Sequence, residues 1–160
     1  MRKIFLIAAL ASNAALTSGT AIACDVATSE KMLRPATGDI SSGFGMRFHP
    51  LLNQQKMHEG VDFAGATGDP ILAARGGRVV ETGRKGYYGN YVRIDHGDGL
   101  ATAYGQLAEI LVTEGACVRS GDVIGKRGST GLSSGPHLHF EVLRGEQPVD
   151  PAPLLAQPKA

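Results

Sequence analysis

The feature that most constrains the fold is a succession of short apolar stretches separated by glycines. The chain has 22 glycines among its 160 residues, and glycine adopts the positive φ of tight turns without strain. No segment has the length and periodicity of a convincing helix, so short strands joined by turns are expected. The predicted strands are 71–74, 78–82, 91–95, 100–104, 110–113, 123–125 and 137–143. This pattern predicts an all-β fold, an antiparallel β-sandwich.

The N-terminus has the composition of a secretory signal. A basic start, Met1-Arg2-Lys3, precedes the apolar run Ile4–Leu10 and the small-residue end Ala21-Ile22-Ala23, which predicts a signal peptide over residues 1–23. The run is too short to span a bilayer, so the mature chain is predicted to have no transmembrane span and to be exported, to the periplasm or outside the cell. Removing these residues takes the formal net charge from +1 to −1, which argues against nucleic acid as a partner.

Two cysteines, Cys24 and Cys117, allow two interpretations. In an oxidising compartment they form a candidate disulfide between the mature N-terminus and the strand around Cys117. Alternatively, Cys24 directly after the signal could carry a lipid anchor, as in a bacterial lipoprotein. Neither cysteine lies in a metal-ligand pattern.

Three of the five histidines fall into two short runs, His58-Glu59-Gly60-Val61-Asp62 and His137-Leu138-His139. The second run continues to Val142 with strict polar and apolar alternation, which predicts a strand with His137, His139 and Glu141 on one face. His58 and Asp62 are four residues apart and share a face if the segment from Met57 to Phe63 is extended. Two imidazoles and one carboxylate suit zinc with an open fourth position, leaving one histidine beside the metal for proton transfer.

The chain resembles the M23 metallopeptidases, the lysostaphin-like or LytM-type peptidoglycan endopeptidases. The resemblance extends from about Ile40 to Pro151 and rests on four stretches in order: 42–50, 58–64, 86–92 and 128–142. It implies a duplicated-hybrid-motif type of β-sandwich and a Zn²⁺ ion held by His58, Asp62 and His139. It also implies His137 as a catalytic residue and peptidoglycan peptide stems as the substrate. The expected organisation is a signal peptide over 1–23, an N-terminal segment over 24–38, the M23 peptidase domain over 39–153 and a C-terminal tail over 154–160.

One position departs from the family pattern. A second catalytic histidine is usual in a Tyr-x-His-Leu motif, and the matching segment here is Tyr104-Gly105-Gln106-Leu107. A glutamine amide can donate a hydrogen bond, but it cannot accept a proton as a base. Gln106 is therefore expected to serve as a weaker catalytic partner of His137, with reduced activity.

Three further residues are candidates for the surroundings of the site. Glu141 could orient a ligand imidazole, Tyr104 could line the substrate groove because it shares parity with Gln106, and His49 lies in a segment that faces the groove in the family. His96, beside the predicted turn Gly97-Asp98-Gly99, is expected to lie far from Gln106 along the strand.

The sequence thus predicts a zinc metalloendopeptidase that hydrolyses peptide cross-links of cell-wall peptidoglycan. Two alternatives are open. The chain could be a non-catalytic relative that binds and activates other cell-wall hydrolases, or a secreted zinc-binding domain without catalysis.

Overall fold

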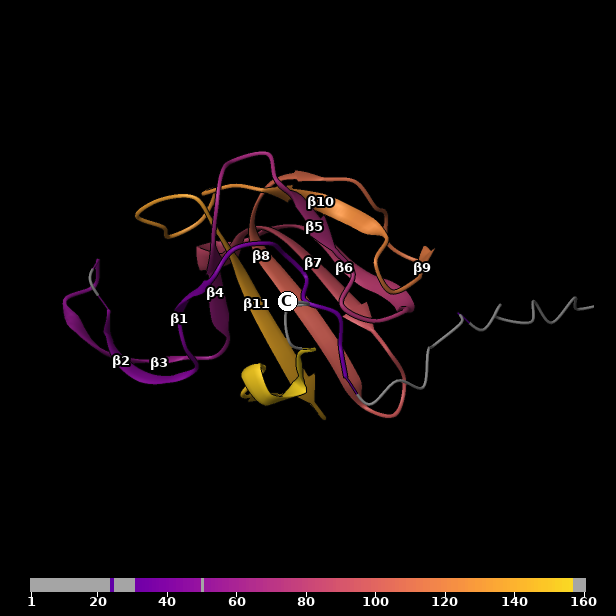
Figure 1. Ribbon diagram of the computed structural model, residues 1–160, viewed down its shortest axis with the longest axis horizontal. Coiled ribbons are helices and arrows are strands. Elements are labelled where there is room, and N and C mark those ends of the chain that lie inside the picture. The colour runs from indigo at the N-terminus through magenta and orange to yellow at the C-terminus, as the bar shows by residue number, and fades with distance from the viewer. Residues whose placement is uncertain (1–23, 25–30, 50, 157–160) are drawn as a thin grey trace, which may run out of the picture.

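The computed structural model describes residues 24, 31–49 and 51–156, and nearly all of its regular structure is β (Figure 1). Every pairing between named strands is antiparallel, which confirms the predicted fold class. The elements are β1 (Ile40–Ser42), β2 (Gly45–His49), β3 (Gln54–His58), β4 (Val61–Ala64), β5 (Pro70–Leu72), β6 (Gly77–Lys85), the 3₁₀ helix η1 (Gly86–Tyr88), β7 (Gly89–Asp95), β8 (Leu100–Ile110), β9 (Cys117–Val118), β10 (Val123–Arg127), β11 (His137–Arg144), β12 (Gln147–Val149) and the 3₁₀ helix η2 (Ala152–Leu154).

The main sheet has the strand order β1-β4-β11-β8-β7-β6-β9, while β10 pairs with both β5 and β8. Strand β8 changes partners along its length. Along one edge of β8, the residues up to Gly105 pair with β11, and the residues from Leu107 pair with β10. Gln106 lies between the two parts and has a positive φ of 66°. The shared strand therefore carries the sheet from one layer into the other at this residue.

The core lies between these layers. Leu138, Phe140 and Val142 of β11 are fully buried and belong to one cluster with Ile71 of β5 and Ile124 of β10. This is the face that the alternation in the sequence predicts to be inward. The opposite face of β11 carries His137, His139 and Glu141, so the core positions the candidate site on the outer face of the sheet.

The strand prediction differs from the structure in several places, and the short strands β1 and β12 were not predicted. The stretch 110–113 is not a strand of its own, because Ile110 ends β8 and residues 111–113 lie in no strand. The hairpin β2–β3 was not predicted, and it forms a separate two-stranded sheet beside the main one (Figure 1). Its apolar residues Met46 and Phe48 are exposed by 67% and 55%, so a search for buried apolar stretches passes over it.

The described ends of the domain pair with each other. Met32 forms an isolated bridge with Leu155, and both side chains are buried in the core. The described part of the segment predicted over 24–38 therefore packs on the sheet, together with the first residues of the predicted tail. The predicted signal peptide lies outside the described residues. Within the described part of the chain, no helix is long and apolar enough to cross a membrane.

A buried arginine holds the segment before β1 against the sheet. Arg127 at the end of β10 is fully buried and donates hydrogen bonds to the carbonyls of Ala64 and Thr37. Its guanidinium also lies 3.0 Å from the carboxylate of Asp69. Three segments thus share one cation.

Candidate metal centre

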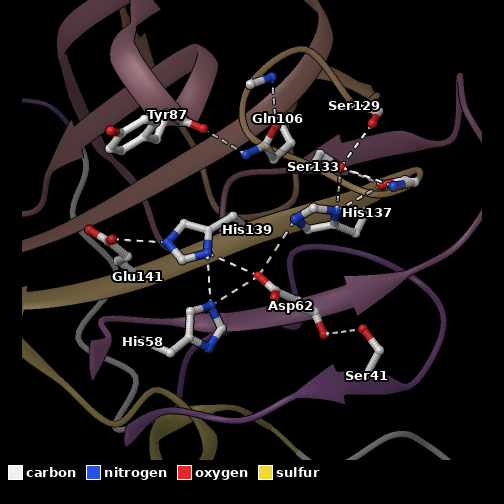
Figure 2. A network of polar contacts seen from close by, with 12 residues as sticks. Ser41, His58, Asp62, Tyr87, Gln106, Ser129, Ser133, His137, His139 and Glu141 are labelled. Atoms are coloured by element: carbon white, nitrogen blue, oxygen red, sulfur yellow. Dashed lines mark hydrogen bonds and ion pairs between the residues drawn. The ribbon is translucent and has the colours of Figure 1, made fainter. Parts of the chain in front are cut away.

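Three predicted ligands meet on the outer face of the sheet (Figure 2). His58 Nε2 lies 3.2 Å from Asp62 Oδ1 and 3.1 Å from His139 Nδ1. His139 Nδ1 lies 2.9 Å from the same oxygen, Asp62 Oδ1. Three different strands supply the residues, so the cluster exists only when β3, β4 and β11 are all in place.

The strands bring these residues together by register. Asp62 of β4 pairs directly with His139 of β11, so both side chains leave the sheet on the same face. The segment from His58 to Asp62 was expected to be continuously extended, whereas a bend at Gly60 separates β3 from β4. A side chain at Gly60 would place its Cβ 2.3 Å from the carbonyl oxygen of Phe140. The glycine therefore lets the chain turn closely over β11 and aim His58 back at Asp62.

In each of the two imidazoles, the nitrogen that points away from the cluster makes a hydrogen bond, and this bond determines that the other nitrogen carries the lone pair. His58 Nδ1 lies 2.7 Å from the carbonyl oxygen of Gly43 and must donate to it. His139 Nε2 lies 2.9 Å from Glu141 Oε1 and donates to that carboxylate. In the neutral form of each ring the other nitrogen then carries a lone pair. Two imidazole lone pairs and a carboxylate oxygen converge, which is the donor set that zinc binds.

The same convergence shifts the ionisation of the metal-free groups. Burial acts to lower the pKa of His139, but hydrogen bonds to Asp62 and Glu141 outweigh it and raise the pKa to about 9. Burial acts to raise the pKa of Asp62, yet hydrogen bonds from His139 and His58 lower it well below its usual range. A positive charge between these groups is therefore favourable, whether a proton or a metal ion supplies it.

His137 lies beside the three ligands without joining them. Its Nδ1 donates to the carbonyl of Gly135 at 2.9 Å, and its Nε2 lies 3.8 Å from Asp62 Oδ1. Because Nδ1 holds the ring proton, Nε2 of the neutral ring offers a lone pair on the side of the cluster. The structure thus places an imidazole nitrogen that can accept a proton beside the candidate metal position.

Glu141 connects the cluster to η1. Its Oε1 accepts from His139 and also from the hydroxyl of Tyr88 at 2.8 Å. The carboxylate is buried, with 4% of the residue exposed. Burial and the nearby Glu141 carboxylate raise the pKa of Tyr88, so the tyrosine stays a donor. A carboxylate behind a ligand imidazole orients the ring and increases its basicity.

Gln106 is in the same groove, with both ends of its amide engaged (Figure 2). Its Oε1 accepts from the backbone N–H of Gly131 at 2.7 Å, and its Nε2 donates to the carbonyl of Tyr87 at 2.9 Å. Flipping the amide would set donor against donor and acceptor against acceptor, so its orientation is fixed. Gln106 therefore ties η1 to the loop before β11.

Tyr104 and His96 are not part of the groove. Tyr104 is fully buried in the core, where its hydroxyl accepts from the Ala74 N–H and the Thr102 hydroxyl. The prediction that Tyr104 lines the groove beside Gln106 is wrong. It assumed that side chains alternate regularly along β8, and the positive φ at Gln106 interrupts that alternation. His96 is buried between the Gly76 carbonyl and Thr102.

His49 lies in the groove, and the two cysteines lie elsewhere. His49 Nδ1 accepts from the Leu52 N–H at 3.2 Å; burial and the neighbouring Arg47 charge lower the pKa of the ring. Cys24 and Cys117 are joined in a disulfide. That bond connects the chain before Lys31 to β9, at the far edge of the main sheet from β4.

Two adjoining cavities flank the cluster, of about 320 Å³ and about 300 Å³. Residues that sequence reasoning did not single out also line them: Arg47, Lys56, Met57, Tyr87, Tyr88 and Leu132. A signal was present for Arg47, since it alternates with His49 in a short strand. Lys56 of β3 places its Nζ over the Tyr87 ring, 5.0 Å from the ring centre. The hairpin and η1 therefore approach each other across the groove.

Comparison with known proteins supports the assignment of the fold and the family. The family model described as "Peptidase family M23" matches residues 56–151. A DD-carboxypeptidase/endopeptidase Mpg of Neisseria meningitidis is 48% identical over 112 residues, which are 70% of this chain and 26% of that protein. The peptidoglycan DD-endopeptidase ShyB of Vibrio cholerae is 42% identical over 112 residues, 69% of this chain and 26% of that protein.

A solved structure gives the same result in three dimensions. The crystal structure of a zinc-containing peptidase from Vibrio cholerae superposes with a TM-score of 0.70 at 37% identity, covering 84% of this chain and 40% of that one. The chain spans about a quarter of the length of the curated relatives described above. The match to the family model covers more than half of the sequence and includes all three residues of the cluster. The chain therefore belongs to peptidase family M23.

Proposed function

We propose that this chain is a zinc-dependent endopeptidase that hydrolyses peptide cross-links in bacterial cell-wall peptidoglycan. The observation that carries the proposal is the convergence of three metal-ligand atoms next to the free Nε2 of His137. Relatives named as peptidoglycan DD-endopeptidases and a zinc-containing peptidase of the same fold support the substrate and the metal. The protein would act outside the cytoplasm, on peptide stems and not on nucleic acid.

His58, Asp62 and His139 would hold the zinc ion. When bound, zinc supplies Lewis acidity, which lowers the pKa of a coordinated water to about 7 and polarises the scissile carbonyl. The lone pair on His137 Nε2 accepts the proton of the attacking water and returns it to the departing amine. The bond from His137 Nδ1 to Gly135 keeps the ring in the tautomer that this step requires.

Gln106 would act as a positioned neutral donor. Its amide does not titrate near neutral pH, so it cannot share proton transfer with His137. One hydrogen of Nε2 is used by Tyr87, and the second would be the one to reach a substrate oxygen in the groove that Gln106 lines. The absence of a second acid or base there is expected to cost a factor of about 10² to 10⁴ in rate.

The alternative is a non-catalytic or weakly catalytic M23-like domain that binds and activates other cell-wall hydrolases. One experiment separates the two functions: digestion of purified sacculi by the mature protein, beside Gln106→His and His139→Ala, with zinc measured in each preparation. Muropeptide release by the wild type that is lost in His139→Ala supports the peptidase. Stoichiometric zinc without release by the wild type, together with release by Gln106→His, would refute the enzyme and favour a binding role.

The two cysteines form a disulfide in the proposed mature protein, and a lipid at Cys24 is the competing state. A lipid anchor requires a free Cys24 sulfur, which the disulfide consumes. A Cys24→Ser protein that still fractionates with membranes would rule out anchoring through this residue.

A further inference from the structure

His137 stands at the start of β11 with only one of its two ring nitrogens held. Its Nε2 lies 3.8 Å from Asp62 Oδ1, which is too long for a hydrogen bond. Its Nδ1 is the nitrogen that is held, 2.9 Å from the carbonyl oxygen of Gly135 and 3.2 Å from the hydroxyl of Ser133 (Figure 2). The direction in which Nε2 points is therefore set by two oxygens on the far side of the ring.

Regular structure does not hold the Gly135 carbonyl in place. The loop 128–136 joins β10 to β11, and Gly135 lies in neither strand. Pro136 follows it and has no N–H, so the carbonyl is the only hydrogen-bonding group of that peptide unit. A Cβ at Gly135 would meet nothing within 4 Å, so no neighbouring atom confines the residue on that side. The carbonyl that orients His137 needs another support.

Ser133 supplies this support. Its hydroxyl donates to the Gly135 carbonyl at 2.6 Å, and its oxygen accepts from the Gly135 N–H at 3.3 Å. Because the single hydroxyl proton goes to Gly135, the oxygen must also be the acceptor for Ser129, whose hydroxyl lies 2.8 Å away, and for His137 Nδ1. One side chain thus holds Gly135 on both sides of its Cα and contacts the imidazole as well.

The first half of the same loop is anchored independently of Ser133. The Thr130 hydroxyl donates to a carbonyl of β8, and the Gly131 N–H donates to a side-chain amide of β8. The Leu132 N–H donates to a carbonyl of η1 at 2.9 Å. Loss of the Ser133 hydroxyl should therefore leave this half in place and release only the part of the loop next to His137.

Resting on the proposed function, we propose that Ser133 is a positioning residue for His137, with Ser129 as its support. It holds the ring so that Nδ1 keeps its proton and Nε2 faces the cluster. When Nε2 accepts a proton, the ring becomes an imidazolium and its Nδ1–H becomes a stronger donor. The contact with Ser133 therefore strengthens during the reaction, and it contributes to turnover more than to substrate binding.

The kinetic test compares Ser133→Ala, Ser133→Thr and Ser134→Ala in the zinc-loaded protein. Ser133→Ala is expected to lower kcat about 10-fold, the lower end of the range for a hydrogen bond to a charged group, with KM and zinc content unchanged. Ser133→Thr keeps the hydroxyl and should recover most of the rate. Ser134→Ala is the matched control, because it removes a hydroxyl from the exposed neighbour in the same loop.

The tautomer of His137 gives a second readout, which does not depend on hydrolysis. Nitrogen NMR of the isotope-labelled ring, at a pH where the ring is neutral, should show the proton on Nδ1 in the wild type and in Ser133→Thr. In Ser133→Ala it should show a mixture of both tautomers. Ser129→Ala keeps Ser133 and removes its support, so it should show a smaller change in the same direction.

The two readouts separate this inference from the proposed function. Wild-type kcat in a folded Ser133→Ala protein would overturn the positioning role while the peptidase stands. A fall in kcat with the wild-type tautomer, or with loss of zinc, would assign Ser133 to loop stability and overturn the positioning role as well. If Ser133→Ala does not fold, an unchanged tautomer in Ser129→Ala decides against it. A tautomer change in Ser133→Ala, with no hydrolysis by the wild type, would refute the peptidase and support the positioning role.

Discussion

Glu141 offers the sharpest test of how the site is assembled, because it is hydrogen-bonded to the proposed metal ligand His139 and is not itself a proposed ligand. Its Oε1 accepts from His139 Nε2 at 2.9 Å and from the Tyr88 hydroxyl at 2.8 Å. In Glu141→Gln the amide oxygen can still accept both bonds, so the charge is lost while the geometry is kept. In Glu141→Ala both donors lose their partner, and the His139 ring is no longer held in the tautomer that turns Nδ1 towards Asp62.

The expected loss of zinc affinity follows from the strength of the hydrogen bond between His139 and Glu141. A hydrogen bond to a charged group contributes about 1.5 to 3 kcal/mol, which corresponds to about 10- to 100-fold in an equilibrium constant. We expect zinc affinity to fall about 10-fold in Glu141→Gln and about 100-fold in Glu141→Ala, in line with the usual effect of residues behind a metal ligand. Glu109→Gln is the matched control, since Glu109 is an exposed carboxylate that pairs with Lys126.

The assay is competition for zinc against a chromophoric chelator, with thermal unfolding of each metal-free variant to confirm that it is folded. Tyr88→Phe, which removes one of the two donors, should weaken zinc binding by only a few-fold. Wild-type zinc affinity in a folded Glu141→Ala protein would refute the argument that this carboxylate fixes the His139 tautomer.

Three further outcomes are expected. The pKa of about 9 for metal-free His139 means that zinc must displace a proton at neutral pH, so zinc affinity should rise from pH 7 to 9 by up to about tenfold per unit; calorimetry in buffers of different ionisation enthalpy measures the released proton, and a pH-independent affinity would contradict it. Arg127→Met should lower the free energy of unfolding by about 2 to 3 kcal/mol in chemical denaturation, because it leaves Asp69 and two carbonyls without their buried cation; an unchanged stability would show that those groups find water instead. Thiol titration of the exported protein should find no free thiol before reduction and two after it, whereas a lipid at Cys24 would leave Cys117 reactive throughout.

Much of the site could be predicted because period-2 alternation translates directly into shared faces. Counting residues places the two histidines of β11 on one face. It does not place Asp62, because the bend at Gly60 interrupts the extended segment from His58; Asp62 meets His139 because the two residues pair across β4 and β11. Counting residues failed for Tyr104, because the count assumes extended backbone and cannot foresee a residue with a positive φ. Gln106 is such a residue, and nothing in its local sequence signals a positive φ.

The hairpin β2–β3 could be anticipated only in part, through the family resemblance that placed His49 at the groove. Its burial is inverted, with exposed Met46 and Phe48 and inward Arg47, so hydrophobicity gives the wrong face. The two ends of the Gln106 amide bond to Gly131 in a loop and to Tyr87 in η1, which are 25 and 19 residues away in the sequence. Contacts of this kind come from topology, and a single sequence does not report them.

The direct pairing of Asp62 with His139 has a consequence for folding. A slip of one residue between β4 and β11 would turn one of the two side chains to the opposite face of the sheet. A metal ion that requires both would then select the correctly aligned chain from its misaligned neighbours and hold it there. Zinc binding would therefore favour the correct strand register, and retention of zinc would report on correct folding before any substrate is present.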